Sequence, residues 1–367
     1  MPHSQLIKRT ATFALVAIFA VVAPLHTLIP SVEAASPSAS ARVIQKLKKQ
    51  IAALKKQLAA ATTPPAPFIE VVKVGNVGNA PDQNFGQGAF GRVNYEFQIG
   101  KTEVTLAQYT AFLNAVAATD THALYSSALA TNENIAGIAQ NGTSGNFTYS
   151  VIGTGTRPVT FVSWFDAARF CNWLHNGRPT GAQNAGTTEQ GAYTLDGTIS
   201  GGLDIVRNPG ARFWIPSENE WYKAAYHQPA AQGGDADDYW LYPTRSNTPP
   251  GNQIGPLPLA NHANLRIDLN SVSIFSVTQA AGLSPTQSYL TEPGSYPASA
   301  SFYGTTDQGG NVGEWTEGVV ISFSERVVRG GDWNSDEARV RSSVDRNSDS
   351  RIPSTKRSPT GFRVAAP

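Results

Sequence analysis

Sulfur-containing side chains are nearly absent from this chain of 367 residues, which has one cysteine and one methionine. With a single cysteine there is no internal disulfide, so the core must hold the fold without one. Cys171 is in line with Trp164, Ala167 and Leu174 at helical spacing, and free cysteine is among the most buried residue types. We therefore expect a buried Cys171, the alternative being a reactive or metal-binding thiol.

Histidine and the common catalytic motifs are also lacking. The six histidines are scattered and include no H-x-x-x-H pair, which argues against a metal site built on two histidines of one helix. Neither a G-x-S-x-G elbow nor a phosphate-binding glycine loop is present. The sequence therefore gives no support for a serine hydrolase or a nucleotide-binding enzyme.

Charged residues are few, at 15 %, whereas there are 33 glycines and 24 prolines. This composition predicts a loop-rich fold with many turns, and the 41 % hydrophobic content permits a packed core. The charge is unevenly distributed, because residues 36–62 carry six basic and no acidic residues, whereas residues 63–367 carry 20 basic and 26 acidic residues. A basic arm thus precedes an acidic body, which argues against nucleic acid as the partner of the body.

One apolar run stands out near the start of the chain. Residues 13–23 are apolar, follow Lys8 and Arg9, and end at Pro24. The run is shorter than the roughly 20 residues that span a bilayer, and residues 32–34 offer small side chains for cleavage. We expect residues 1–34 to be a signal peptide and the protein to be exported to the periplasm, cell envelope or medium. An uncleaved anchor is the alternative.

Residues 35–61 form the basic arm, in which apolar residues repeat at intervals of three and four. This heptad pattern predicts a short coiled coil that makes a homo-oligomer through residues 44–58, and a solvated helical stalk is the alternative. The seam positions are Ile44, Leu47, Ile51, Leu54 and Leu58. Prolines make residues 62–67 a stiff linker, so we place the folded body at residues 68–367.

The body begins with two expected strands, at residues 68–74 and 93–99, where β-branched and aromatic residues are frequent. Three helices are expected further along. Thr105, Ser163 and Ser217 each precede an acid or amide by three residues, which is the pattern of a capping box at a helix start. The apolar residues behind each cap are expected to pack in the core.

Two glycine pairs lie close together near the C-terminal end. Residues 308–315 read Gln-Gly-Gly-Asn-Val-Gly-Glu-Trp, residues 326–333 read Arg-Val-Val-Arg-Gly-Gly-Asp-Trp, and residues 361–364 read Gly-Phe-Arg-Val. Glycine allows a close backbone approach, and tryptophan adds apolar bulk with one N–H. These segments predict a glycine-kinked core or pocket.

These segments resemble the formylglycine-generating enzyme, or sulfatase-modifying factor, family, whose members carry G-N-x-W-E-W, R-V-x-R-G-G-S-[WY] and G-F-R. Residues 103–112, 158–174 and 213–225 are similar to further family motifs, in the same order. The resemblance implies an α+β fold, namely a single loop-rich C-type-lectin-like domain. Gly313 and Asp332 depart from the family pattern, which has tryptophan and serine there.

The resemblance also implies calcium, which prefers oxygen ligands. The family's G-N-x-x-E site carries over to Gly310, Asn311, Val312 and Glu314, and a second site beginning at A-N-[IL] carries over to Asn264 and Leu265. The second site lacks its partner acid, because residues 283–290 contain no Asp or Glu. The alternative is that Asn311 and Glu314 only satisfy turn amides.

The family enzyme oxidises a cysteine of a sulfatase peptide with copper held by two cysteines. In motif register those two positions are Ser335 and Val340, neither of which can bind Cu(I), since this ion selects soft sulfur ligands. We therefore expect copper, and the copper mechanism, to be absent. Whether any enzymatic activity remains is left open.

The remaining interpretation is binding, because residues 332–358 are rich in Asp, Asn, Ser and Arg and lie where the family builds its active-site wall. The predicted cleft residues are Trp315, Asp332, Trp333, Asn334, Ser335 and Arg341. The ligand would be a protein, peptide or glycan. Two alternatives stay open, a solvated loop held by arginine–aspartate pairs and an oxidoreductase with a modified site.

Overall fold

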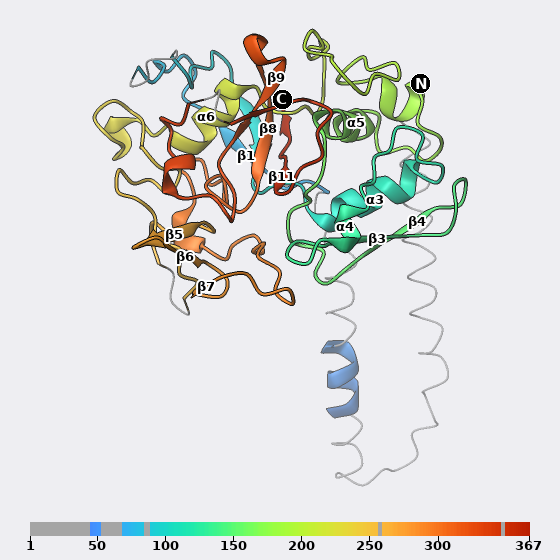
Figure 1. Ribbon diagram of the computed structural model, residues 1–367, viewed down its shortest axis with the longest axis horizontal. Helices are drawn as coiled ribbons and strands as arrows, with labels where there is room; N and C mark the ends of the chain where they lie inside the picture. The colour runs from blue at the N-terminus through green and yellow to red at the C-terminus, as the bar shows by residue number, and fades with distance from the viewer. Residues whose placement is uncertain (1–44, 53–67, 84–88, 256–258, 346–348) are drawn as a thin grey trace, which may run out of the picture. The chain divides into compact units, whose positions relative to one another are not determined.

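The computed structural model in Figure 1 describes residues 45–52, 68–83, 89–255, 259–345 and 349–367. The chain divides into two compact units, Met1–Ala66 and Pro67–Pro367. In the first unit residues 45–52 are helical, and Leu47 and Ile51 are exposed. The other three seam positions, the expected signal peptide and most of the linker lie outside the described residues, so the coiled coil stays a prediction. No helix within the described ranges is long and apolar enough to cross a membrane.

The three helices expected in the body are all present. Helix α3 spans Leu106–Val116, α5 spans Trp164–His175 and α6 spans Glu218–Tyr226. Each begins with a complete capping box, in which the N-cap hydroxyl accepts from the third helical N–H and that residue's side chain accepts from the N-cap N–H. The short helix α4, Ala128–Thr131, was not expected.

The first sheet joins the two ends of the body. Its strand order is β1 (Val71–Val74), β2 (Phe97–Gly100) and β12 (Ala365–Ala366), and both pairings are antiparallel. The two expected strands are therefore real but shorter than predicted. Tyr95, within the second expected strand, lies before β2 and is exposed.

The central sheet carries the glycine-rich segments in the order β10–β9–β8–β11. Its strands are Ser350–Arg351, Glu325–Arg329, Gly313–Val320 and Thr360–Gly361, in that order. The β8–β9 hairpin has an irregularity between Trp315 and Val319, and β11 runs parallel to β8. This pairing brings the G-F-R segment against the first glycine motif.

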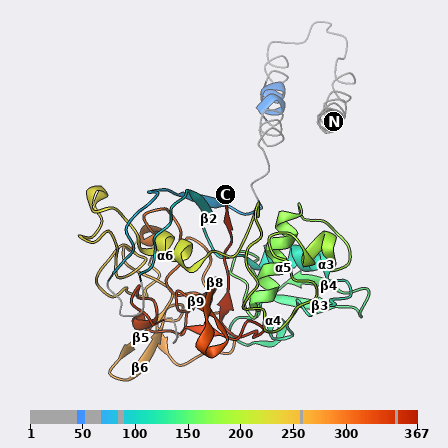
Figure 2. The same ribbon diagram turned by 90° about the horizontal axis from the view of Figure 1, so that it is seen from above.

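Two small sheets complete the body. One consists of β3 (Ile138–Asn141) and β4 (Thr148–Val151), and the other of β5 (Arg266–Leu269), β6 (Val272–Phe275) and β7 (Ala280–Ala281). In both views these two sheets lie on opposite sides of the β8–β9 hairpin (Figures 1 and 2). The described part of the body also contains one π-helix and four 3-10 helices, at Ala185–Glu189, Ala230–Gln232, Pro297–Ser299, Ile321–Phe323 and Glu337–Arg339.

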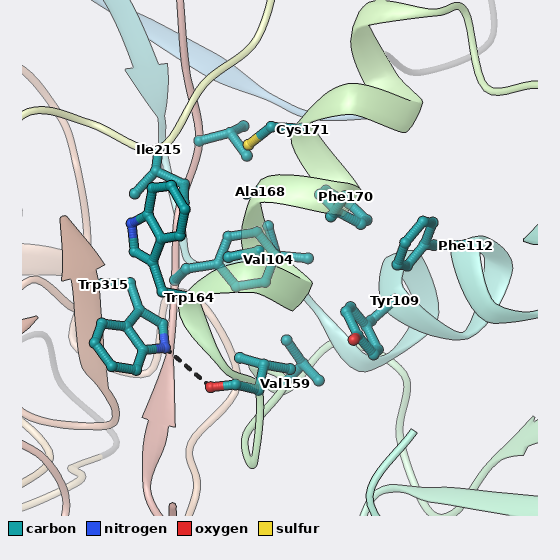
Figure 3. Packing of buried hydrophobic residues seen from close by; sticks show 14 of the residues in the cluster. Val104, Tyr109, Phe112, Val159, Trp164, Ala168, Phe170, Cys171, Ile215 and Trp315 are labelled. Atoms are coloured by element: carbon teal, nitrogen blue, oxygen red, sulfur yellow. Dashed lines mark hydrogen bonds between the residues drawn. The ribbon is translucent and has the colours of Figure 1, made fainter. Parts of the chain in front are cut away.

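The main core lies between α3, α5 and the central sheet. Phe112 of α3 and Phe170 of α5 meet edge to face at 5.4 Å, and Phe170 makes a similar contact with Phe362 of the G-F-R segment at 5.3 Å. Figure 3 shows Trp164, Cys171 and Trp315 in the same cluster. Cys171 is fully buried, as expected from its helical register. The α+β class predicted from the sequence is therefore confirmed.

Candidate functional site

The first glycine motif, which we define as Gln308–Trp315, is held against Asn264 by a close backbone contact. Gly310 and Asn311 have φ angles of 84° and 62°, and the Asn311 N–H donates to the Asn264 carbonyl at 2.8 Å. A Cβ atom on Gly310 would lie 2.2 Å from that same carbonyl oxygen. Glycine is therefore required at position 310 by both backbone angle and space.

The Asn311 side chain is fully used within the protein. Its Oδ1 accepts from Asn264 Nδ2 at 3.0 Å and from the N–H and hydroxyl of Thr291 at 3.0 and 3.2 Å. Its Nδ2 donates to Glu103 Oε1 at 3.0 Å. Leu265, the other residue of the second predicted calcium site, is a fully buried apolar side chain. The structure thus brings both predicted calcium segments together, but it does so through hydrogen bonds between them.

Glu314 is the centre of a buried ion pair. Arg363 donates to both of its oxygens, at 2.5 Å to Oε2 and 2.6 Å to Oε1, and Trp221 Nε1 donates to Oε2 at 2.7 Å. Glu314 and Arg363 are both fully buried. Such a two-pronged arginine–carboxylate contact fixes geometry as well as charge. Three of the roughly four lone-pair sites of Glu314 are therefore used inside the protein, and Oε1 keeps one.

Two neighbouring carboxylates have the properties that Glu314 lacks. Glu103 Oε2 and Asp307 Oδ2 are buried and have no hydrogen-bond partner. Burial raises the pKa of Asp307 to about 6, and burial followed by the charge of Asp307 raises the pKa of Glu103 well above its ordinary value. The Arg363 guanidinium partly offsets both shifts. Together these groups form a buried acidic cluster with too little positive charge.

The cluster contains the kind of oxygen atoms that calcium takes as ligands. Calcium takes carboxylate and backbone carbonyl oxygens, and Asp307 is three residues before Gly310. Within the described ranges no group of three or more His, Cys, Asp or Glu side chains is placed to hold a metal ion. A calcium ion here would therefore depend on Asp307 and Glu103 together with backbone carbonyl oxygens.

The positions that correspond to the family's cysteine pair are filled differently. Val340 is fully buried and packs with Tyr242, Ala263 and Leu265. The Ser335 carbonyl accepts from the Arg266 N–H at 3.0 Å, which ties this loop to β5. Both positions serve the packing of the loop, and neither offers a thiol.

The two tryptophans of the predicted cleft lie inside the protein. Trp315 is fully buried and donates from Nε1 to the Val162 carbonyl at 2.9 Å (Figure 3). Trp333 is 5 % exposed, stacks on Tyr289 at 4.9 Å between ring centroids, and leaves its Nε1 without a partner. Neither indole can contact an external ligand in this arrangement, so we remove both from the proposed surface.

The other four predicted cleft residues reach solvent. Asn334 is exposed, and Asp332, Ser335 and Arg341 are partly exposed. Asp332 Oδ1 accepts from the Asn334 N–H at 2.8 Å, and burial raises the pKa of Asp332 to about 6. Arg341 Nε is buried and has no hydrogen-bond partner among the described residues. These four residues therefore place polar side chains at the protein surface.

Sequence reasoning missed Asp307 and gave no role to Glu103 and Arg363. The sequence does contain a signal for Arg363, because an arginine between the apolar residues Phe362 and Val364 is expected to be buried and to need an acid. Nothing local identifies that acid as Glu314, which lies 49 residues earlier. Asp307 stands in a polar loop, where aspartate is common and its burial cannot be foreseen.

Comparison with solved structures gives several similar chains. "Crystal Structure of CarF" is 21 % identical, with 82 % of this chain and 98 % of that chain covered and a TM-score of 0.44. Treponema denticola variable protein 1 is 17 % identical, with 81 % and 94 % covered and a TM-score of 0.40. PvdO from Pseudomonas aeruginosa is 16 % identical, with 81 % and 94 % covered and a TM-score of 0.44.

A search of curated proteins found no match. The profile of the sulfatase-modifying factor enzyme 1-like domain, in contrast, matches residues 62–367 and so includes every glycine motif described above. It also includes the three capped helices and the buried Glu314–Arg363 pair. The chain therefore belongs to the sulfatase-modifying factor enzyme 1-like, or formylglycine-generating enzyme, family.

Proposed function

We propose that this protein is an exported binding module of the family that does not generate formylglycine. The observation that carries the proposal is the pair of positions 335 and 340. A copper site needs two soft sulfur ligands, whereas this chain has a serine and a buried valine there. The family framework is thus used without the thiols of its oxidase chemistry.

Cys171 does not replace the missing pair. It is fully buried in the middle of α5, and burial raises the pKa of its thiol well above the ordinary value. Metal binding and nucleophilic attack both require the thiolate, which burial disfavours. The one thiol of the chain is therefore a core residue.

The proposed binding surface consists of Asp332, Asn334, Ser335 and Arg341. Support comes from their solvent contact and from their polar side chains, which can donate hydrogen bonds to a ligand or accept them from it. The 3-10 helix Glu337–Arg339 lies between them and keeps the loop short and ordered. We expect the ligand to be a protein, peptide or glycan with hydrogen-bonding groups.

Calcium is proposed as a structural ion at the buried acidic cluster, with Asp307 and Glu103 as the side-chain ligands. A divalent cation would bind one oxygen of each carboxylate, Glu103 Oε2 and Asp307 Oδ2, which have no partner among the described residues. Oligomerisation through residues 44–58 is proposed to present several binding surfaces at once, which raises avidity without new contacts. Signal peptide, export and coiled coil remain part of this proposal.

Incubation with a cysteine-containing sulfatase-motif peptide, copper, a reductant and oxygen tests the catalytic part. We expect mass spectrometry to show no conversion of the peptide thiol to aldehyde, with the calcium-loaded protein remaining folded. The alternative function, an oxidoreductase with a modified site, predicts turnover. Turnover that persists in a Cys171→Ala variant would overturn the proposal.

Peptide and glycan arrays test the binding part. We expect any ligand retained by the full chain to be lost in an Asn334→Ala, Arg341→Ala double variant. Asn141→Ala is the matched control, because Asn141 is an exposed asparagine on the separate β3–β4 hairpin. Equal ligand retention by all three proteins would show that the surface is not the binding site.

A further inference from the structure

The helix of the first unit, residues 45–52, carries a cluster of positive charge and is drawn in blue in Figure 1. Lys46, Lys48 and Lys49 lie on this helix and are exposed. Residues 36–62 contain six basic residues and no acid, so the sequence around these lysines offers no carboxylate to pair with them. The body has the opposite balance, with 20 basic and 26 acidic residues. Positive charge is therefore concentrated on the arm.

The lysines and the apolar residues of this helix lie on different sides of it. Successive residues of a helix are rotated by roughly 100°, so Leu47 and Ile51, which are four positions apart, share one side. Lys49 is midway between them in the sequence and therefore lies on the opposite side, with Lys46 and Lys48 on the two flanks. Pairing of two arms through Leu47 and Ile51, as proposed above, would thus cover the apolar side and leave the lysines in solvent.

An anionic phospholipid membrane is the partner that this arm fits best. A lysine ammonium is a compact charge on a flexible stem, so it reaches lipid phosphates without a fixed geometry. Clusters of roughly four to eight basic residues that lie close to a membrane segment are typical of binding to anionic lipids. The six basic residues of the arm follow the apolar run at residues 13–23, which we expect a membrane to take up whether or not it is cleaved afterwards. An acidic polysaccharide also offers negative charge, but the sequence contains nothing that would bring the arm to one.

We propose that the basic arm binds the surface of a membrane that contains anionic phospholipids, with Lys46, Lys48 and Lys49 facing the lipid phosphates. The inference goes beyond the proposed function and does not depend on it, because it uses residues of the first unit and not the proposed binding surface of the body. Pairing of two arms would double the number of lysines that meet the membrane at once, which strengthens the attachment without a new kind of contact.

Co-sedimentation of the purified protein with lipid vesicles tests the proposal. One set of vesicles contains phosphatidylglycerol and phosphatidylcholine in equal parts, and the other contains phosphatidylcholine alone. We expect stronger binding to the first set, and we expect the difference to disappear at roughly 0.5 M salt, because ions screen exposed charges. A Lys48→Gln, Lys49→Gln double variant should bind the anionic vesicles at least about tenfold more weakly, since each lysine near such a surface contributes about a factor of five. The matched control is a Lys73→Gln, Lys101→Gln double variant, which removes the same charge from the surface of the body.

Equal binding to the two sets of vesicles, or an equal loss of binding in the arm variant and in the control, would overturn the proposal. Retention on immobilised heparin without binding to the anionic vesicles would also overturn it and would indicate an acidic polysaccharide as the partner. Residues 1–34 are the same in every variant, so any contribution of the expected signal peptide cancels in the comparison. Glutamine forms helices about as well as lysine, so the helix should persist in the arm variant. Thermal unfolding at the wild-type temperature checks that the body of each variant is folded.

Discussion

The glycine motif Gln308–Trp315 and the Asp332–Ser358 segment differ in how their polar groups are used. In the first, the side chains of Gln308, Asn311, Glu314 and Trp315 all have hydrogen-bond partners inside the protein. In the described part of the second, Trp333 Nε1, Arg341 Nε and Asp349 Oδ2 have none. The two regions are adjacent, since the Trp333 N–H donates to the Asn311 carbonyl at 3.1 Å.

This difference distinguishes the glycine motif, whose polar side chains hold the fold together, from the Asp332–Ser358 segment, whose polar groups are less completely paired. Buried polar groups must be paired, so a motif whose side chains are mutually paired can tolerate little change. The second segment is less completely paired, because three of its buried polar atoms have no partner among the described residues.

Breaking the buried ion pair should have the largest effect. We expect Glu314→Gln to lower the free energy of unfolding by about 3–5 kcal/mol, because Arg363 is left as a buried charge without its full partner. Urea unfolding measures the change. A loss below roughly 1 kcal/mol would mean that the pair behaves like an exposed one, and that the contrast between the two regions is wrong.

The second largest loss of stability is expected when calcium is removed, and it should come from the region of the glycine motif Gln308–Trp315. With calcium at 100 times its dissociation constant, chelation should lower the unfolding free energy by about 2.7 kcal/mol. Asp307→Asn should abolish most of this difference, whereas Asp268→Asn, on strand β5, should preserve it. Thermal unfolding with and without chelator provides the comparison. An unchanged response in Asp307→Asn would remove calcium from the buried acidic cluster.

In the Asp332–Ser358 segment, the titration of Asp332 should make the stability of the protein depend on pH. Its pKa is raised from 3.8 to about 6, so the native state holds this proton more tightly than the unfolded state. The contribution of Asp332 to stability is therefore greatest below about pH 4 and is lost as pH rises through 6. Between pH 4 and 7 wild type should lose roughly 2 kcal/mol relative to Asp332→Asn, allowing for partial exposure. Parallel pH profiles of the two proteins would contradict this.

The smallest effect is expected for an ion pair of the Asp332–Ser358 segment in which the aspartate is buried and the arginine is half-exposed. Arg339 and Asp349 are 3.4 Å apart, and the Arg339 side chain is 45 % exposed. Arg339→Gln should cost less than about 1 kcal/mol in urea unfolding. A cost comparable to that of Glu314→Gln would show that this segment is also part of the framework.

The features that the sequence predicted correctly are local ones. The capping boxes at Thr105, Ser163 and Ser217 each depend on four consecutive residues, and all three helices begin where expected. The two-residue strands β10, β11 and β12 were missed because each is defined by a distant partner strand rather than by its own residues. Their existence depends on the chain path.

For the candidate site, the sequence predicted which residues belong to it better than it predicted the contacts that they make. The glycine motif was identified, and calcium binding by Asn311 and Glu314 stays a prediction; the sequence did not indicate that these side chains also pair with Thr291 and Arg363. Trp315 was expected at a cleft, because an indole combines apolar surface with one donor, and the Val162 carbonyl satisfies that donor in the core. Which of two suitable partners a buried group meets is decided by tertiary packing.

The pairing of β12 with β2 has a consequence for the order in which this protein can be made. Ala365 pairs with Ile99, and Arg363 Nη1 donates to the Gly100 carbonyl across 263 positions of the chain. During synthesis the third strand of the first sheet and the arginine partner of Glu314 are both missing until residues 363–366 have left the ribosome. Termination before Arg363 would therefore leave Glu314 without its arginine and β2 with an open edge. A tag after the exposed Pro367 would leave those contacts intact.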